Sequence, residues 1–362
     1  MRKRDASEAR PSIFHTSVFI LALLVLLAVL VFSVLGAVTF GNADLSVKDV
    51  YSVILYEVFK FDSLSAYKEG PVHDVVWLIR LPRVLLALGV GMGLSVCGVV
   101  MQAIVRNPLA DPYILGVSSG ATLGATLSIM LGIGSFLGGN SVGLMAFAGA
   151  IITSFAVMYI ANMGGRATSG KLILAGTAVS SVCSAFSNFV LYITNDNSAT
   201  AQVTFWTMGS LSGADWTRVS VILPVILLCS LFFWSQFRNL NLMLLGDDVS
   251  VTLGADLHRV RSLYLLISAL MVGFSVYCAG MIGFVGLIIP HVIRILFGTD
   301  HRRLVPLASL LGSVFLIWCD VACRVILKNA ELPIGILVSI IGAPCFIYLL
   351  VRRSYGFGGG KD

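Results

Sequence analysis

Charged side chains are scarce in this sequence. Asp, Glu, Lys and Arg make up 12% of the 362 residues and hydrophobic residues make up 57%, whereas about 25% of the residues in an ordinary soluble domain are charged. A surface of this composition does not stay dissolved in water. The net charge of +6 is explained by membrane topology, and it gives no reason to expect a nucleic-acid partner.

Groupings of catalytic or metal-ligating side chains are missing as well. The five histidines are scattered without metal-ligand spacing, and the seven cysteines form no CxxC pair. All the cysteines lie in apolar stretches, where they are expected to pack as small buried residues. We therefore expect that the chain is not an enzyme and that it has no catalytic residue and no bound metal or cofactor.

One segment has the spacing of a phosphate-binding loop. Residues 165–171 read GRATSGK, which satisfies GxxxxGK, but Leu172 follows where the motif requires a magnesium-binding Ser or Thr. A charge-free apolar segment precedes it, whereas a phosphate-binding loop follows a buried strand. Nucleotide binding at this segment is therefore not expected.

Long apolar runs predict an all-α polytopic membrane protein. A span needs about 20 apolar residues to cross ~30 Å of hydrocarbon. The charge-free run 112–165 must therefore hold two spans, and the run from Ser262 is divided near its glycines at 280–286. The ten predicted spans are 17–39, 80–105, 113–132, 142–163, 171–193, 217–237, 262–280, 283–297, 304–324 and 334–351. The first is longer than the apolar core of a signal peptide, so a retained helix is expected.

The distribution of Lys and Arg places both termini in the cytoplasm. With this topology the cytoplasmic segments hold 16 of the 24 Lys and Arg residues and the outer segments hold 8, in agreement with the positive-inside rule. The predicted organisation is a cytoplasmic tail at 1–16, a single transmembrane domain at 17–351 and a cytoplasmic tail at 352–362.

Two hydrophilic segments are long enough to contain helices of their own. On the outside, an amphipathic helix is expected near 47–61. Inside, the loop 238–261 is expected to form two short helices with a break at Gly254, and a cytoplasmic segment of this size typically docks a partner. Between the second and third spans, two prolines in RNPLADP (106–112) forbid a continuous helix and predict a sharp cytoplasmic turn. This turn either lines the inner mouth of a pathway or is only a rigid corner.

Charged residues at the outer ends of the spans allow two interpretations. Arg80, Arg83 and Arg324 stand where an arginine stem can lie along apolar surface while the guanidinium reaches water, or where it can pair with carboxylates of a docking protein. Asp320 precedes Arg324 by four residues, a spacing that permits an ion pair. An isolated carboxylate in a membrane is unfavourable by about 3 kcal/mol, so Asp320 is expected to have a partner or a water-filled cavity.

Most of the chain after residue 80 resembles the FecCD type of ABC-importer permease, a family that includes permeases for ferric siderophores, haem and cobalamin. The stretches that carry the resemblance are RLPRVLLALGVGMGLSVCGVVMQAIVRNPLADPYILGVSSGA (80–121), KLILAGTAVSS (171–181), FWTMGSLSGADW (205–216), LGDDVSVTLGADLHRVR (245–261), GMIGFVGLIIPHVIRILFGTDHRRLVPLASLLGS (280–313) and ELPIGILVSIIGAPCFIYLL (331–350). The resemblance implies the type II ABC importer permease fold with ten helices per subunit.

The resemblance also implies partners. Two permeases, as a homodimer or as paralogues, would form the pathway in a bacterial inner membrane. Two cytoplasmic ATPases would hydrolyse ATP, and an external binding protein would deliver the chelate. Ferric siderophore is the first expectation for the substrate, with haem and cobalamin as alternatives.

Site residues are carried over by position. The resemblance assigns Arg80, Arg83 and Arg324 to docking of the binding protein, and Asn107, Leu109, Thr168 and Ser169 to a cytoplasmic gate. It assigns the segment 246–260 to contact with the ATPase, including Gly246, Asp247, Asp248, Leu253, Gly254, Ala255, Arg259 and Val260.

Two readings of another class stay open. An ion-coupled secondary transporter would use Asp320 and broken helices as its ion site, but it gives no reason for the elaborate 238–261 loop. An integral-membrane enzyme would need a catalytic cluster, which the sequence does not offer.

Overall fold

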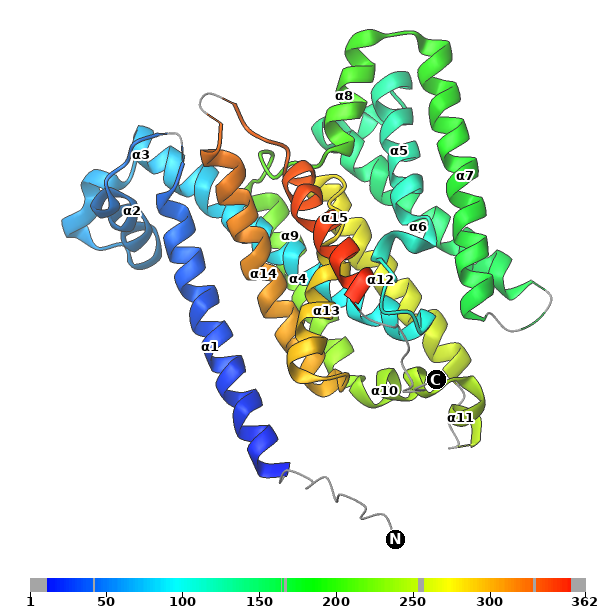
Figure 1. The fold of residues 1–362 in the computed structure, drawn as a ribbon. Coiled ribbons are helices and arrows are strands. Elements are labelled where there is room, and N and C mark those ends of the chain that lie inside the picture. Colours follow the sequence, from blue (N-terminus) through cyan, green and yellow to red (C-terminus); the bar gives the residue numbers. More distant parts are fainter. Residues whose placement is uncertain are drawn as a thin grey trace.

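The computed structural model describes residues 12–41, 43–163, 165, 168–252, 257–327 and 330–352, and every regular element in these ranges is helical (Figure 1). The α-helices are α1 (Ser12–Thr39), α2 (Val47–Phe59), α3 (Pro71–His73), α4 (Leu81–Val105), α5 (Val117–Leu131), α6 (Ser141–Asn162), α7 (Ser169–Thr194), α8 (Asn197–Thr207), α9 (Trp216–Ser235), α10 (Phe237–Leu245), α11 (Asp247–Thr252), α12 (Leu257–Ala279), α13 (Val285–Phe297), α14 (His301–Val325) and α15 (Ile334–Arg352). Short 3-10 turns η1 (Asp62–Tyr67), η3 (Pro112–Leu115) and η4 (Ser135–Asn140) and a π-helical segment η2 (Asp74–Arg80) connect them.

Each predicted span coincides with one of these helices. In the described residues, seven helical segments are long and apolar enough to cross a membrane, and Val117–Leu131, Val285–Phe297 and Ile334–Tyr348 are shorter apolar helices. The third predicted span was placed to begin at residue 113, but α5 begins at Val117. Helix α5 begins later than predicted because Gly116, which follows η3, has a φ of 73° and changes the direction of the chain. We call the two ends of the bundle outer and cytoplasmic after the predicted topology.

Helix α4 is the centre of the bundle. It is buried around nearly its whole circumference, and it packs against α14, α9, α12 and α13 (Figure 1). A helix that is apolar on all sides belongs in such a position. Small residues allow the close approach: a Cβ on Gly98 would lie 1.8 Å from the carbonyl oxygen of Gly286, and one on Gly91 would lie 2.3 Å from that of Gly312.

A second group of helices stands beside this core. Helices α5, α6 and α7 pack against one another, and α8 packs on α5 (Figure 1). A small apolar cluster of Met130, Val190, Ala199 and Val203 joins α8 to α5 and α7. Sequence reasoning did not predict α8, because its eleven residues lie between two spans and are rich in Ser, Thr and Asn.

The outer segment between α1 and α4 contains the expected amphipathic helix. Helix α2 covers Val47–Phe59, and the hydroxyl of Ser46 accepts a hydrogen bond from the backbone N–H of Asp49 at its start. The hydroxyl of Tyr67 donates to the carboxylate of Asp49 at 2.9 Å and so fastens the returning η1 turn. Hydrogen bonds from Ser46 and Tyr67 lower the pKa of Asp49. The helix predicted near 47–61 is therefore confirmed.

The long cytoplasmic loop folds as two short helices, α10 and α11. The break between them is at Gly246, where φ is 98°. Glycine is required at this break because an L side chain rarely adopts that backbone conformation. The break predicted at Gly254 lies outside the described residues. The predicted coupling residues Leu253, Gly254 and Ala255 lie outside the described residues.

Candidate functional site

Two of the predicted docking arginines complete the outer end of α1. Arg80 donates to the carbonyl oxygens of Val38, Thr39 and Ala43 at 3.2, 2.9 and 2.6 Å. Arg324 donates to the carbonyl oxygen of Phe40 at 3.0 Å. The last carbonyls of a helix have no partner inside it and carry partial negative charge. The two guanidinium groups therefore tie α1 to the start of α4 and to the end of α14.

The third arginine bridges two carboxylates. Nε of Arg83 lies 2.8 Å from Oδ1 of Asp320, and its Nη1 lies 2.7 Å from Oε1 of Glu331. Oδ2 of Asp320 also lies 3.1 Å from Nε of Arg324. The predicted i to i+4 ion pair is therefore confirmed, and Asp320 has the partner that its position in the membrane required. We call Arg80, Arg83, Asp320, Arg324 and Glu331 the outer arginine cluster.

The structure does not support the first interpretation, in which these guanidinium groups reach water. Arg80, Arg83 and Arg324 are 4–5% exposed, because helix-end carbonyls and Asp320 hold them inside the bundle. Only Glu331 brings the cluster to the surface, with a side chain that is 41% exposed. The docking role of the arginines stays a prediction, and Glu331 is a residue that sequence reasoning missed.

The two predicted gate segments lie next to each other at the cytoplasmic end. Helix α4 ends at Val105, and Arg106 follows it with a φ of 54°. The carboxamide of Asn107 then accepts a hydrogen bond from the N–H of Leu109 at 2.9 Å. From the other segment, Ser169 donates its hydroxyl to the carbonyl oxygen of Ile104 at 3.3 Å. Thr168 caps α7 by accepting from the N–H of Lys171. The sharp turn predicted at 106–112 is confirmed, and its role in gating stays a prediction.

Asp111 anchors the same turn. Its carboxylate accepts a hydrogen bond from the N–H of Tyr113 at 2.8 Å. Burial raises the pKa of Asp111 from 3.8 to about 6, although backbone hydrogen bonds from Tyr113 and Phe284 lower it. An ionisable group with a pKa close to physiological pH thus lies beside the predicted gate.

Helix α10, which directly precedes the predicted coupling segment 246–260, is fastened to the start of α14. Asn241 on α10 donates to Oδ1 of Asp300 at 2.8 Å, and its carboxamide oxygen accepts from the N–H of His301 at 2.9 Å. In the segment itself, Gly246 is buried, Arg259 is exposed and Val260 is partly buried, while Asp247 lies at the start of α11. The Asn241 contact was missed because no spacing in the sequence relates residues 241 and 300.

Three helix breaks meet at the outer end of the bundle. The N–H groups of Ile334 and Gly335 donate to the carbonyl oxygens of Gly209 and Met208 at 3.2 and 3.0 Å, and the N–H of Ser210 donates to Ala279 at 2.8 Å. We call residues 206–210, 279–283 and 333–335 the outer crossing. These bonds pair backbone groups that the breaks leave without helical partners, as a membrane interior requires.

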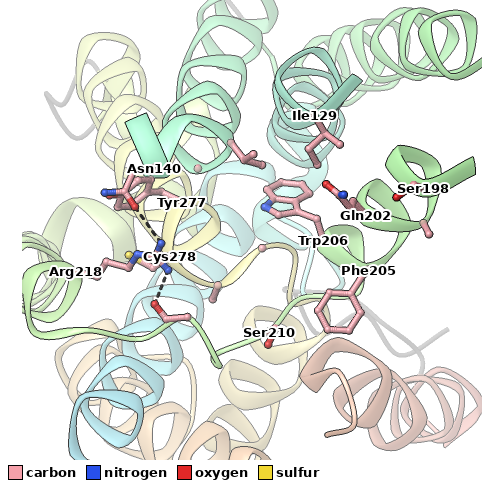
Figure 2. A pocket seen from close by; sticks show the side chains of 17 residues that line it. Ile129, Asn140, Ser198, Gln202, Phe205, Trp206, Ser210, Arg218, Tyr277 and Cys278 are labelled. Atoms are coloured by element: carbon pink, nitrogen blue, oxygen red, sulfur yellow. Dashed lines mark hydrogen bonds between the residues drawn. The ribbon is translucent and has the colours of Figure 1, made fainter. Parts of the chain in front are cut away.

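Cavities lie on both sides of the outer crossing. One, of about 690 Å³, is bounded by α8, α12 and the starts of α6 and α9. In Figure 2 the aromatic rings of Phe205 and Trp206 lie on its α8 side, and Arg218 is hydrogen-bonded to Asn140. The other, of about 560 Å³, is lined by Tyr113, Ser118, Thr207, Met208, Met281, Gly283, Gly335, Ile336, Ser339 and Ile340. None of these ten residues is charged, so this cavity offers only weak polar contacts.

In the part of the chain that the structure describes, no group of three His, Cys, Asp or Glu side chains could hold a metal ion. The features found are instead those of a passage through a helical bundle: broken helices, cavities at their breaks and polar clusters at both ends.

Comparisons with known proteins agree with this geometry. The family model of the FecCD transport family matches residues 20–352. The hemin transport system permease HmuU of Yersinia pestis is 37% identical over 92% of this chain and 95% of its own length, and the ABC transporter permease YvrB of Bacillus subtilis is 37% identical over 90% and 91%. The cobalamin import permease BtuC of Halobacterium salinarum is 40% identical over 77% and 74%.

A solved structure of an inward-facing ABC transporter of the metal-chelate type has 32% identity and a TM-score of 0.77, over 91% of this chain and 99% of its own. The chain is thus a multi-pass membrane protein with the fold of an ABC importer permease, and it belongs to the FecCD transport family.

Proposed function

We propose that this chain is the permease subunit of an ATP-driven importer, and that it forms the pathway for an iron-siderophore-type chelate in a bacterial inner membrane. The observation that carries the proposal is the uncharged cavity of about 560 Å³ at the outer crossing. The ligand of a chelate covers the metal ion, so the wall of the cavity meets the surface of the ligand and not a bare cation. Thioether, hydroxyl and backbone groups hold such a molecule weakly and allow its release.

The proposal gives each end of the bundle a task. The outer arginine cluster receives an acidic surface of an external binding protein that delivers the chelate. The segment 246–260 contacts one of two ATPase chains, and the turn at 106–112 with the start of α7 closes the cytoplasmic end. A second permease, either a copy or a paralogue, completes the pathway. The chain itself binds no cofactor, and ATP is used by the partner ATPases.

Haem and cobalamin are alternative substrates of the same proposal. They are supported by the names of two relatives, the hemin permease of Yersinia pestis and the cobalamin permease of Halobacterium salinarum. Both molecules are also bulky metal complexes, so the uncharged cavity does not separate them from a ferric siderophore.

The ion-coupled transporter is less well supported. Its ion site would have to include Asp320, but the carboxylate oxygens of Asp320 lie 2.8 and 3.1 Å from Nε of Arg83 and Nε of Arg324. Both carboxylate oxygens are thus already paired with guanidinium groups, and a bound cation would have to displace them.

The test is uptake into proteoliposomes that contain the purified assembly of this chain with its ATPase and binding protein. The probes are a ferric hydroxamate, a ferric catecholate, haem and cyanocobalamin, each with ATP and with a non-hydrolysable ATP analogue. Accumulation of one iron chelate with ATP alone supports the proposal. Accumulation of haem or cyanocobalamin instead changes the substrate, and accumulation driven by a proton or sodium gradient without ATP overturns the proposal.

A further inference from the structure

The two carboxylates that hold Arg83 differ in their surroundings. The side chain of Asp320 is 1% exposed and is also paired with Arg324. The side chain of Glu331 is 41% exposed, and among the described residues its ion-pair partner is Arg83. If the side chain of Asp320 turned away, two buried guanidinium groups would lose the carboxylate that they share. Exchange of Glu331 would require only that an exposed side chain turn into water.

Glu331 is also close in sequence to the outer crossing. It precedes Ile334 by three residues, and the N–H groups of Ile334 and Gly335 hold the carbonyl oxygens of Gly209 and Met208. Leu332 is fixed between them by its N–H, which donates to the carbonyl oxygen of Cys323 at 3.3 Å. Met208 and Gly335 line the uncharged cavity. A short segment thus connects a surface carboxylate to the wall of the pathway.

We propose that Glu331 is a replaceable internal partner of Arg83: a carboxylate of a docking protein takes its place, and the release of Glu331 loosens the outer crossing. The partner that fits is therefore an Asp or Glu side chain on a protruding surface. An arginine fork binds a carboxylate with directed hydrogen bonds, so an incoming carboxylate can reproduce the contact that Glu331 gives up. This inference depends on the proposed docking role of the outer arginine cluster.

Charge favours the exchange. The cluster holds three guanidinium groups against two carboxylates, so it carries a net positive charge that attracts an acidic partner. Glu331 opposes docking because it occupies the same donor. If Glu331 is bound nine-tenths of the time, its removal raises the apparent docking affinity about tenfold. An exposed contact of this kind is screened by salt, so the gain is expected to shrink as ionic strength rises.

The experiment measures docking of the importer's own binding protein to the assembled permease and ATPase in lipid nanodiscs. Glu331→Gln keeps the size of the side chain and removes its charge. We expect it to tighten docking by about tenfold at low salt, and Glu331→Asp is expected to give a smaller effect because it keeps a competing carboxylate. Glu69→Gln is the matched control, because Glu69 is an outer carboxylate that is 84% exposed and lies 3.6 Å from Lys68, outside the cluster.

A second measurement follows the outer crossing without any partner. Hydrogen exchange of the amides of Ile334 and Gly335 reports the bonds to Gly209 and Met208. We expect faster exchange at these amides in Glu331→Gln than in the wild type or in Glu69→Gln. In the wild type, docking of the binding protein should produce the same acceleration.

Arg83→Gln separates the two levels of the argument. If Arg83→Gln weakens docking while Glu331→Gln fails to tighten it, the proposed replacement of Glu331 by a partner carboxylate is wrong and the docking role stands. If neither variant changes docking, the docking role itself is wrong. If the rate of hydrogen exchange at the amides of Ile334 and Gly335 is unchanged in Glu331→Gln, the proposed link between Glu331 and the outer crossing is wrong, whatever the docking result.

Discussion

Arg83 and Asp320 are separated by 237 residues in the sequence and form an ion pair, with Nε of the arginine 2.8 Å from Oδ1 of the carboxylate. The pair joins the outer end of α4 to the outer end of α14. Both side chains are withdrawn from solvent, at 6% and 1% exposure, so each compensates the buried charge of the other.

Removal of the Asp320 carboxylate is expected to lower the stability of the protein more than loss of its contact with Arg83 or with Arg324 alone. Asp320→Ala leaves Arg83 and Arg324 buried without the carboxylate they share, and breaking a buried ion pair from one side typically costs about 3–5 kcal/mol. We expect a fall in the thermal midpoint of the detergent-solubilised protein, measured by intrinsic fluorescence. Asp320→Asn should lower the thermal midpoint less, because the carboxamide oxygen still accepts a hydrogen bond. Equal midpoints for wild type and Asp320→Ala would contradict a structural role for the pair.

Close packing at Gly98 gives a second prediction. A Cβ at this position would lie 1.8 Å from the carbonyl oxygen of Gly286, so Gly98→Ala must push α4 and α13 apart. Overpacking of this kind costs about 1–3 kcal/mol or more, and we expect a lower midpoint and a lower yield of folded protein. Gly36→Ala is the control, since nothing lies within 4 Å of a Cβ there. In α1 the same substitution should be neutral or slightly stabilising, because alanine is the better helix former.

The sequence predicted the helices better than their contacts. Apolar runs of about 20 residues and prolines at 108 and 112 were enough to place the spans and the turn after α4, since these signals are local. Helix α8 was missed because a short polar helix produces no such run. The break at Gly246 was not predicted, because only the backbone shows that this glycine has a positive φ.

In the candidate site, too, local contacts were predictable from the sequence and distant ones were not. The Asp320–Arg324 pair was predictable because its i to i+4 spacing lies on one helix. The partners of Arg83 and Arg80 were not, because they come from α1, α14 and the segment before α15, at separations of 37 to 248 residues. Helix-end carbonyls also cannot be recognised as partners in a sequence, so contact with water stayed open as one interpretation of the three arginines.

Asn241 provides a test of coupling between the ATPase-facing segment and the bundle. Its carboxamide bonds Asp300 and the N–H of His301, so it is expected to transmit movement of α10 to α14. Asn241→Leu removes these bonds, each worth about 1 kcal/mol. We expect ATP hydrolysis by the assembly to continue while chelate uptake per ATP falls severalfold, measured in the same proteoliposomes.

The matched control for coupling is Asn239→Leu. Asn239 lies on the same helix, but its carboxamide donates to the side-chain oxygen of Gln236 at 3.0 Å and, within the described part of the chain, makes no hydrogen bond to α14. This variant should keep the ratio of uptake to hydrolysis. If Asn241→Leu also keeps that ratio, the contact is only structural, and movement must reach the bundle by another route.

Asp111 gives a prediction about pH. Burial raises its pKa from 3.8 to about 6. At pH values between these two pKa values, the folded protein therefore holds a proton on this carboxyl that the unfolded chain has lost. The stabilisation from the protonated carboxyl is therefore full below pH 3.8 and is lost as pH rises through about 6. At pH 7.5 the folded state holds an ionised carboxylate at a penalty of at most about 3 kcal/mol. Asp111→Asn mimics the protonated form and keeps an acceptor for the N–H of Tyr113.

We therefore expect Asp111→Asn to raise the thermal midpoint at pH 7.5 by several degrees and to have little effect at pH 4.5, where the wild-type carboxyl is mostly protonated. The measurement is a thermal scan of both proteins in detergent at the two pH values. Asp196→Asn is the control, because Asp196 also caps a helix, accepting from the N–H of Ser198 at 2.8 Å, but its side chain is exposed. A midpoint of Asp111→Asn that is raised equally at both pH values would mean that the carboxylate is not strained by burial. The predicted gate would then be indifferent to protonation of its turn.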